Sequence, residues 1–491
     1  MSLPAPGVQA RGWRRLAVEP RRPEAVRRLP WAPWLVVGTV CIGAFMGQLD
    51  ASIVTMAFPD LRLDFGSSLA SVQWVGQAYL LVLVGLLLAV GRYADMVGRK
   101  LLYTYGFAVF VAGSALCGLA PSLPWLIAFR ALQGVGAAMF QANSVAILVG
   151  AVPKGRVGRA IGVQGAAQAL GLALGPAIGG LLIGAGGWRL IFYVNVPVGV
   201  VGVALAWLLI PRSRDLAARG RFDWAGLALF APAVCSFLLG LSEGQHFGWG
   251  SAPVLCLFGA AFIFGALFVT RERHASLPML RLDLFRRLPF SAGVASGLLS
   301  YLVLFGALTV VPFYLELAHG ERPGTAGLEL LVLPLGLGIT APVAGRVAER
   351  FGARPLTVGG MVLAAAMLVT STLVDGNPAF VLVALALVGV GLGAFTPPNN
   401  AAIMGAAPPA FSGLASGVLN MTRGLGTSLG LAVAGVAYTV GTSSSLTRAG
   451  QAIAGYRYAA LVLGATAALA AFIAALRGHG PLCRDPAVGS E

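Results

Sequence analysis

Runs of about twenty apolar residues recur along the whole chain, separated by short polar or charged segments. Each run is long enough to cross the hydrocarbon core of a bilayer as an α-helix. The first run extends to about residue 58, which is too long for the apolar part of a cleavable signal peptide. Fourteen such runs begin near residues 32, 69, 101, 124, 159, 189, 224, 252, 289, 325, 354, 378, 412 and 456. The pattern therefore predicts an all-α polytopic membrane protein with fourteen spanning helices.

A long-range repeat divides the chain into two halves. GRYADMVGRKLL (91–102) matches GRVAERFGARPL (345–356), and GVQGAAQALGLALG (162–175) matches GVLNMTRGLGTSLG (417–430). The offsets are 254 and 255 residues, and parallel repeats of six helices build one large transporter fold. The expected parts are a tail at 1–31, a six-helix bundle at 32–211, two inserted helices with linkers at 212–288, a second six-helix bundle at 289–477 and a tail at 478–491.

Composition and charge agree with this pattern. Of the residues, 57% are apolar and 11% are charged, whereas a soluble domain carries about 25% charged residues. A net charge of +16 would suit a nucleic-acid-binding protein, but the basic residues lie in the short segments between apolar runs. With the N-terminus inside, 27 of the 34 Lys and Arg fall in inner segments and five in outer segments. The positive-inside rule then predicts cytoplasmic termini, and the preference for Arg over Lys suggests a bacterial cytoplasmic membrane.

Charged residues inside two of the apolar runs are the main candidates for chemistry. Asp50 lies nine residues from Pro59, about 13 Å deep at the helical rise, and Arg130 lies six residues from Pro124, about 9 Å deep. Such groups usually face a cavity or a partner and mark an ion path, although a carboxylate near the interface can be merely solvated. We expect Asp50 to bind and release protons and Arg130, directly or through Gln133, to stabilise its charged form.

The segment 91–100, GRYADMVGRK, combines charge with glycine between two apolar runs. A basic linker between membrane helices explains its arginines but not its glycines or its acid. Gly91 and Gly98 allow close backbone approach. Asp95 can accept hydrogen bonds from Arg99 or from the N-terminus of an opposing helix.

This segment resembles the G-x-x-x-D-x-x-G-R-K/R signature of the major facilitator superfamily. The matching positions are Gly91, Asp95, Gly98, Arg99 and Lys100. The resemblance implies a cytoplasmic gate, in which the Asp braces the N-terminal end of a helix in the other half, here near 412–413. The repeat copy has Glu349 in place of the Asp and Ala353 in place of the first Arg, so we expect its gate contact to be looser.

Glycine recurs every four residues in ALGLALGPAIGG (169–180). Gly171, Gly175 and Gly179 form one smooth face and Pro176 adds a local bend, a pattern that often means only tight helix packing. The segment also resembles the antiporter signature G-x-x-x-G-P-x-x-G-G, which implies an exporter. We expect this face to press against a helix of the other half and to seal the cavity.

Further segments resemble the fourteen-helix drug:proton antiporter family (EmrB/QacA type). They are LDASIVTMAFP (49–59), SVQWVGQAYLL (71–81), GWRLIFYVNVPVG (187–199) and PMLRLDLFRRLPF (278–290). The resemblance covers about 32–475 and implies the major facilitator fold with two inserted helices and proton-coupled efflux of amphiphilic or drug-like molecules by alternating access. Arg130, within RALQGVG, resembles the superfamily's proton-coupling motif. Export of an endogenous metabolite, lipid or siderophore, and proton-coupled import of a solute, are the alternatives.

A membrane-embedded enzyme acting on lipid is the rival class of function. It requires a clustered acid, base or metal set at one membrane face, and the sequence shows none. Four histidines and five cysteines are scattered and suggest no metal site. We therefore expect a transporter that is not an enzyme, has no cofactor, is driven by a proton gradient and works as a monomer in the bilayer, with a small-molecule substrate and no nucleic-acid partner.

The substrate cavity is expected between the halves, near the middle of the membrane. Candidates are the polar or aromatic residues inside apolar runs, each of which can equally serve hydrogen bonding between helices. They are Phe45, Gln48, Gln141, Asn143, Gln164, Gln168, Tyr301, Asn399 and Asn420, with Asn400 and Arg423 as further members. Glu316, Glu329 and Arg423 leave the charge preference for the substrate open.

Overall fold

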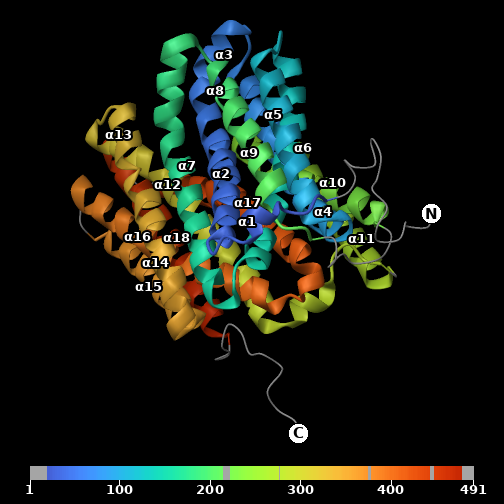
Figure 1. Cartoon of the computed structure of the whole chain (residues 1–491). Coiled ribbons are helices and arrows are strands. Elements are labelled where there is room, and N and C mark those ends of the chain that lie inside the picture. The colour runs from blue at the N-terminus through green and yellow to red at the C-terminus, as the bar shows by residue number, and fades with distance from the viewer. Residues whose placement is uncertain (1–18, 214–221, 276, 374–376, 443–446, 478–491) are drawn as a thin grey trace.

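The computed structural model describes residues 19–213, 222–275, 277–373, 377–442 and 447–477, and all regular structure in these ranges is helical (Figure 1). Fourteen helical segments are long and apolar enough to cross a membrane. These findings confirm the predicted all-α protein with fourteen spanning helices. The expected tail at 478–491 and most of the tail at 1–31 lie outside the described residues.

The first half of the chain forms one helix bundle. Its elements are α1 (Glu24–Arg27), α2 (Ala32–Ile53), η2 (Val54–Ala57), α3 (Phe58–Asp64), α4 (Leu69–Val97), α5 (Arg99–Gly118), α6 (Leu123–Ala151), η3 (Lys154–Arg156), α7 (Val157–Gly186), α8 (Leu190–Tyr193) and α9 (Asn195–Leu209). Aromatic rings fill the space between α5 and α6, where Phe107 stacks on Phe140 with ring centroids 4.9 Å apart. Tyr103 and Phe110 meet the Phe140 ring edge-on. Buried rings of this size contribute much of the packing area of a helix bundle.

The second half repeats this arrangement after an inserted pair of helices. The pair is α10 (Trp224–Phe247) and α11 (Ala252–His274), followed by η5 (Leu282–Arg286). The second bundle contains α12 (Leu288–His319), α13 (Pro323–Glu329), α14 (Val332–Phe351), α15 (Ala353–Thr370), α16 (Pro378–Ala406), η6 (Pro409–Phe411), α17 (Ser412–Thr442) and α18 (Arg448–Ala475). Helix α10 packs against both α4 and α17, so the inserted pair lies along one seam between the bundles.

Glycine pairs at equivalent positions bring helices into contact in each half. A Cβ atom added to Gly136 of α6 would overlap the backbone of Phe110 in α5. In the second half, a Cβ atom on Gly391 of α16 would overlap the carbonyl oxygen of Gly360 in α15. Positions 136 and 391 are separated by the 255-residue offset of the sequence repeat. In a membrane, where lipid is as apolar as leucine, such close backbone approach is a main source of helix association.

The last spanning helix begins earlier than the apolar pattern indicates. The sequence pattern predicts a start near residue 456, but α18 begins at Arg448. The side chain of Thr447 caps this helix, accepting a hydrogen bond from the Gly450 N–H at 3.1 Å. A capped N-terminus and helix-favouring alanines extend the helix beyond its apolar part.

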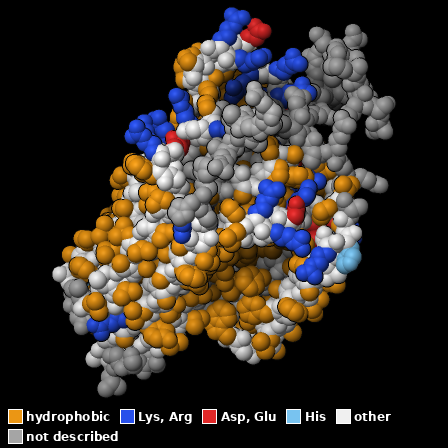
Figure 2. All heavy atoms as spheres, turned by 90° about the horizontal axis from the view of Figure 1, so that it is seen from below, with side chains coloured by type: hydrophobic (Ala, Val, Ile, Leu, Met, Phe, Trp, Pro, Cys, Tyr) orange, Lys and Arg blue, Asp and Glu red, His pale blue; other side chains and the backbone are white. Residues whose placement is uncertain are grey.

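The two ends of the molecule differ in charge. The end that carries the turns at residues 98, 152–156, 210–213 and 275–287, here called the basic end, gathers Lys and Arg side chains (Figure 2). Hydrophobic side chains cover the flanks in the same view. The other end, formed by α3 and α13, is called the opposite end (Figure 1).

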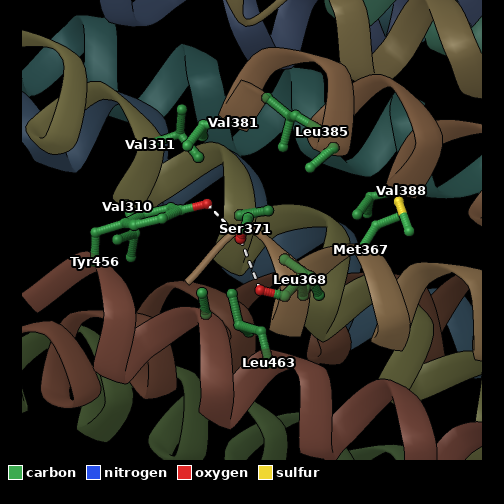
Figure 3. Close-up of a pocket in the computed structure, with 13 residues that line it drawn as sticks. Val310, Val311, Met367, Leu368, Ser371, Val381, Leu385, Val388, Tyr456 and Leu463 are labelled. Carbon is green, nitrogen blue, oxygen red and sulfur yellow. Dashed lines mark hydrogen bonds between the residues drawn. The ribbon is translucent and has the colours of Figure 1, made fainter. Parts of the chain in front are cut away.

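A small pocket inside the second bundle belongs to its core. Tyr456 of α18 donates a hydrogen bond to the Ser371 hydroxyl at 2.8 Å, and Ser371 donates to the Leu368 carbonyl at 2.7 Å (Figure 3). The pocket has a volume of about 10 Å³ and is otherwise lined by aliphatic side chains such as Val310 and Leu463. Its size and lining exclude a drug-sized ligand.

Valine in place of Gly136 should destabilise the first bundle. The added side chain would meet the backbone of α5, which cannot move aside as a flexible side chain can, so we expect a loss of at least ~1–3 kcal/mol in stability. Thermal unfolding of the purified protein in detergent measures this loss. Gly184→Val is the matched control, because a Cβ atom there meets nothing within 4 Å. Equal melting temperatures for the two variants would contradict the packing described.

Candidate functional site

The first spanning helix changes its winding just beyond Asp50. α2 ends at Ile53, and the 3-10 turn η2 precedes Pro59 in the first turn of α3. Proline has no N–H to donate to the carbonyl of Thr55, and this carbonyl instead accepts the N–H of Phe58. The span nevertheless continues to residue 64, so Asp50 lies deeper than counted from Pro59, roughly 21 Å from the end of the helix.

The Asp50 carboxylate is buried among three hydrogen-bond donors. Its Oδ2 accepts from Arg130 Nη1 at 2.8 Å. Its Oδ1 accepts from Gln133 Nε2 and from Asn195 Nδ2, each at 2.9 Å. Asp50 is 0% exposed and Arg130 1% exposed. The structure therefore joins Asp50, Arg130 and Gln133 in one network and adds Asn195 of α9.

Further contacts fix the Arg130 side chain. Its Nε donates to the Val75 carbonyl of α4 at 3.0 Å, and its Nη1 also donates to Gln133 Oε1 at 2.7 Å. The guanidinium carbon lies 4.3 Å from the centroid of the Tyr79 ring. A planar guanidinium held by a ring and three oxygens has one orientation. Breaking such a buried ion pair by removing one partner costs about 3–5 kcal/mol, because the other charge is left uncompensated.

A cavity of about 330 Å³ reaches this network from one side. Arg130 and Tyr79 lie in its wall, together with Gln77 of α4, Ser242 of α10 and Ser428 of α17. The cavity is thus enclosed by the first bundle, the inserted helix and the second bundle. The ion pair of Asp50 and Arg130 therefore lies next to a cavity whose walls come from both halves of the chain.

At the basic end, Asp95 joins the two bundles. Its Oδ1 and Oδ2 accept the backbone N–H groups of Gly413 and Leu414, at 2.9 and 2.8 Å, at the N-terminus of α17. Arg99 donates to Asp95 Oδ1 through two nitrogens, at 3.0 and 2.7 Å. A carboxylate at a helix N-terminus is favoured by the unpaired N–H groups and by the helix dipole. Gly91 permits this approach, because a Cβ atom there would lie 2.5 Å from the Gly413 carbonyl oxygen.

The turn between α4 and α5 is tied to the chain segment before α2. Gly98 adopts φ +117°, which side-chain-bearing residues rarely adopt. Glu19 Oε1 accepts the N–H of Lys100 at 3.1 Å, and Glu19 Oε2 accepts the N–H of Ser213 at 2.7 Å. Lys100 Nζ donates to the carbonyl of Pro20 at 3.1 Å. The five signature residues of the first turn therefore belong to one compact network.

The repeat copy of this contact is weaker. Glu349 of α14 accepts one N–H across the seam, from Arg159 of α7 at 2.9 Å. Gly158 and Gly345 pack backbone to backbone beside it, since a Cβ atom on Gly158 would lie 2.6 Å from the Gly345 carbonyl oxygen. Glu349 thus accepts one backbone N–H, whereas Asp95 accepts two and also forms an ion pair with Arg99.

The glycine face of α7 lies elsewhere than expected. Gly171, Gly175 and Gly179 pack against α2 of the same bundle, where added Cβ atoms would overlap the Phe45 carbonyl, the Ser52 hydroxyl and the Ile53 side chain. The expectation that this face presses against the other half is therefore wrong. The seam of α7 with the second bundle is formed one to three turns nearer the basic end, where Gly162 meets Ala341 of α14. Spacing defines a face of a helix but not the neighbour of that face.

The substrate candidates do not form one cluster. Asn420 Nδ2 donates to the Gln141 carbonyl of α6 at 2.9 Å and so links the two bundles, whereas Asn143 donates to Met139 within its own helix. Asn399 has other partners, because it accepts a hydrogen bond from Arg477 and donates to the Gly293 carbonyl at 3.1 Å. Half-buried or buried positions are also found for Phe45, Gln48, Gln164, Gln168 and Tyr301.

The contacts of Asn399 with Arg477 are structural ones that join helices at the basic end. Arg477 follows the end of α18 and donates to the Ser296 hydroxyl at 2.9 Å as well as to Asn399. Burial lowers the pKa of Arg477 to about 10. The contacts tie α12, α16 and α18 together.

Comparison with known proteins places this architecture in a family. The sequence model of the Major Facilitator Superfamily matches residues 40–279 and 293–482. The chain belongs to the Major Facilitator Superfamily. It is a multi-pass membrane transporter of a small molecule.

Three relatives match most of the transporter. It is 34% identical over 407 residues to multidrug resistance protein Stp of Mycobacterium tuberculosis, covering 82% of this chain and 76% of Stp. It is 35% identical over 406 residues to the tetracenomycin C resistance and export protein of Streptomyces glaucescens, with the same coverage of 82% and 76%. It is 34% identical over 401 residues to the riboflavin transporter RibZ of Clostridioides difficile, covering 81% of this chain and 87% of RibZ.

A solved structure supports the fold. The proton:xylose symporter XylE bound to 6-bromo-6-deoxy-D-glucose superposes with a TM-score of 0.61, at 15% identity, over 90% of this chain and 94% of XylE. At this identity, the likeness shows the fold alone.

Sequence reasoning missed several residues of the transporter's site. Asn195 lies in GWRLIFYVNVPVG, which carries the family resemblance, but an uncharged residue near the start of an apolar run gave no signal of contact with Asp50. The Val75 carbonyl acts through the backbone, which side-chain patterns do not reveal. Glu19 lies in a segment predicted as a basic tail, yet it is 2% exposed and bonded to two turns.

Replacing Asp95 by Asn should loosen the basic end of the transporter. The amide keeps one acceptor oxygen but loses the charge that holds Arg99 and the α17 N-terminus. We expect hydrogen–deuterium exchange in 412–417 to become at least about tenfold faster, since each charge-assisted bond contributes roughly 1.5–3 kcal/mol. Asp64→Asn is the control, because its ion pair with Arg189 is exposed and lies at the opposite end, in α3 and the segment before α8. Unchanged exchange in Asp95→Asn would show that the contact does not hold this end together.

Proposed function

We propose that the transporter exports small amphiphilic or drug-like molecules in exchange for protons. The network around Asp50 carries the proposal, because a carboxylate deep in a membrane helix, paired with Arg130 and beside a cavity, fits a proton carrier. Two relatives are named as a multidrug resistance protein and an antibiotic resistance and export protein, which supports the substrate class and the direction of transport.

In this proposal, protonation of Asp50 is the coupling step. The charged carboxylate attracts Arg130 and accepts three hydrogen bonds. A proton bound to one of its oxygens neutralises the charge and turns that oxygen into a donor, so the attraction to Arg130 is lost and the network must rearrange. Loss of the proton restores it. The site therefore has two arrangements that differ by one proton, as an exchange mechanism requires.

Alternating access assigns roles to the two ends. We propose that the basic end faces the cytoplasm, with both termini on that side, and that the contacts of Asp95 and Glu349 close it in the state described here. Substrate enters from this end when these contacts part and leaves at the opposite end, while a proton moves inward. The helices of each bundle move together, since parallel repeats of this kind rock against each other around a central site.

An endogenous metabolite is the second candidate substrate. The relative named as a riboflavin transporter matches as much of the chain as the resistance proteins do. Both candidates use the same proton site, so the choice between them depends on substrate alone. An export screen in everted vesicles that includes tetracenomycin C, ethidium and riboflavin separates the two.

Asn in place of Asp50 should abolish gradient-driven efflux. The amide cannot exchange a proton, and it leaves the Arg130 charge without its acid, so a loss of stability is expected as well. We expect uptake of the best screened compound into everted vesicles, normalised to the amount of folded protein in the membrane, to lose its dependence on the pH gradient. Asp60→Asn in α3 is the matched control, because Asp60 lies outside the network and is not in the apolar part of the span. Gradient-driven uptake by Asp50→Asn equal to wild type would remove Asp50 from the proton path.

Leucine in place of Gly175 should impair transport by displacing α2 next to the proton site. An added Cβ atom overlaps the hydroxyl of Ser52, two residues from Asp50. We expect efflux to fall at least about tenfold, because a displacement of about 1 Å in a site can cost a factor of a hundred. Gly180→Leu on the same helix is the control, since a Cβ atom there meets nothing within 4 Å. Normal efflux by Gly175→Leu would make the glycine face dispensable for transport.

A further inference from the structure

One face of α17 carries three polar residues between its N-terminus and its middle. Ser416, Asn420 and Arg423 are four and three residues apart, so they lie along the same side of the helix. Arg423 lies eleven residues after the start of α17, roughly 17 Å along it. Its side chain is 8% exposed.

The buried polar atoms of this face lack partners in the described part of the chain. They are Ser416 Oγ, Asn420 Oδ1, Arg423 Nε and Arg423 Nη1. Other buried arginines have partners, since Arg130 has Asp50 at 2.8 Å and Arg477 donates to Ser296 and Asn399, whereas no described carboxylate lies within 4 Å of the Arg423 guanidinium. A buried cation without an acid is costly, so its retention indicates a function that needs the charge.

An aromatic ring orients the Arg423 guanidinium. Its central carbon lies 5.3 Å from the centroid of the Tyr301 ring of α12. A guanidinium packed on a ring keeps the N–H groups in its own plane free to donate. The unpartnered Nε and Nη1 are two such donors.

This face lies at the seam between the bundles. Asn420, one turn before Arg423, donates to the Gln141 carbonyl of α6 in the first bundle. The 255-residue repeat relates Arg423 to Gln168 of α7, a substrate candidate in the first half. Substrate sites in transporters with repeated halves lie near the membrane centre at the interface of the repeats.

We propose that Arg423, oriented by Tyr301, binds an anionic group of the transported molecule, such as a carboxylate or a sulfonate. The proposal rests on the proposed transport function and adds the substrate class, an amphiphile with one negative charge. The anion binds along one edge of the guanidinium, formed by Nη2 together with either Nε or Nη1, and two of its oxygens each accept one N–H. The Tyr301 ring packs against its hydrophobic part.

Equilibrium dialysis against the protein in lipid nanodiscs tests the site, with empty nanodiscs subtracted. The probes are naphthalene-2-sulfonate and the uncharged naphthalene-2-sulfonamide, which share one ring system. Wild-type protein should bind the sulfonate at least about tenfold more tightly than the sulfonamide, the value expected for hydrogen bonds to a charged group. Arg423→Gln should abolish this preference. Arg423→Lys should keep a part of it, because lysine supplies the charge without the two-pronged geometry.

Two further variants separate recognition from architecture. Arg346→Gln removes an exposed arginine of α14 and should leave the preference intact. Tyr301→Leu should weaken sulfonate binding more than sulfonamide binding, because the cation loses its ring. Arg423→Gln should melt no lower than wild type without ligand, since it removes an uncompensated buried charge.

The outcomes distinguish this proposal from the proposed exchange of protons. Equal binding of sulfonate and sulfonamide by wild-type protein overturns the site, whether or not the variants fold, and so does a sulfonate preference that survives in Arg423→Gln. Asp50→Asn should keep the sulfonate preference, because dialysis involves no gradient. Failure of Asp50→Asn to alter gradient-driven uptake concerns the proton step alone.

Discussion

The buried ion pair between Asp50 and Arg130 is the constraint around which the first bundle is arranged. Neither charge can remain in an apolar interior without partners, so four helices supply them: α4 through a carbonyl, α6 through Arg130 and Gln133, α9 through Asn195, and α2 through the acid itself. Each donor holds its helix at a fixed depth and rotation. In the proposed mechanism, a proton on Asp50 rearranges this network, because three donors are directed at the two charged oxygens of the carboxylate.

Close backbone contact through glycine governs the rest of the architecture. Within each bundle, equivalent glycines bring neighbouring helices together, as at Gly136 and Gly391. Between bundles, Gly91 and Gly158 do the same at the two seams of the basic end. Smooth surfaces of this kind place few side chains in one another's way, which suits the separation of helices that the proposed mechanism requires. Polar bonds then decide how firmly each seam is held.

The helix count and much of the layout could be predicted from sequence, because apolar runs of spanning length are a strong signal. The depths of Asp50 and Arg130 likewise indicated that the two could meet, and the structure joins them. Where prediction failed, the sequence did not reveal which helix packs against a given helix face. Periodicity aligned Gly171 with Gly175 but assigned the wrong partner helix. An N-cap at Thr447 outweighed the polar residues that obscured the start of α18, and the backbone carbonyl of Val75 has no sequence signature.

The inserted helix α10 bonds to both bundles near the opposite end. Gln77 of α4 is hydrogen-bonded to Ser242, and Gln245 of α10 donates to the Leu431 carbonyl of α17 at 3.2 Å. Ser242 and Gln245 are one helical turn apart, so a single short stretch of α10 spans the boundary. If the two bundles move relative to each other, this stretch of α10 cannot keep both hydrogen bonds. Either the bond to Gln77 or the bond to Leu431 then breaks, while the other is kept. Helix α10 would then stay against the cavity beside Arg130 during the conformational change and keep lipid out of it.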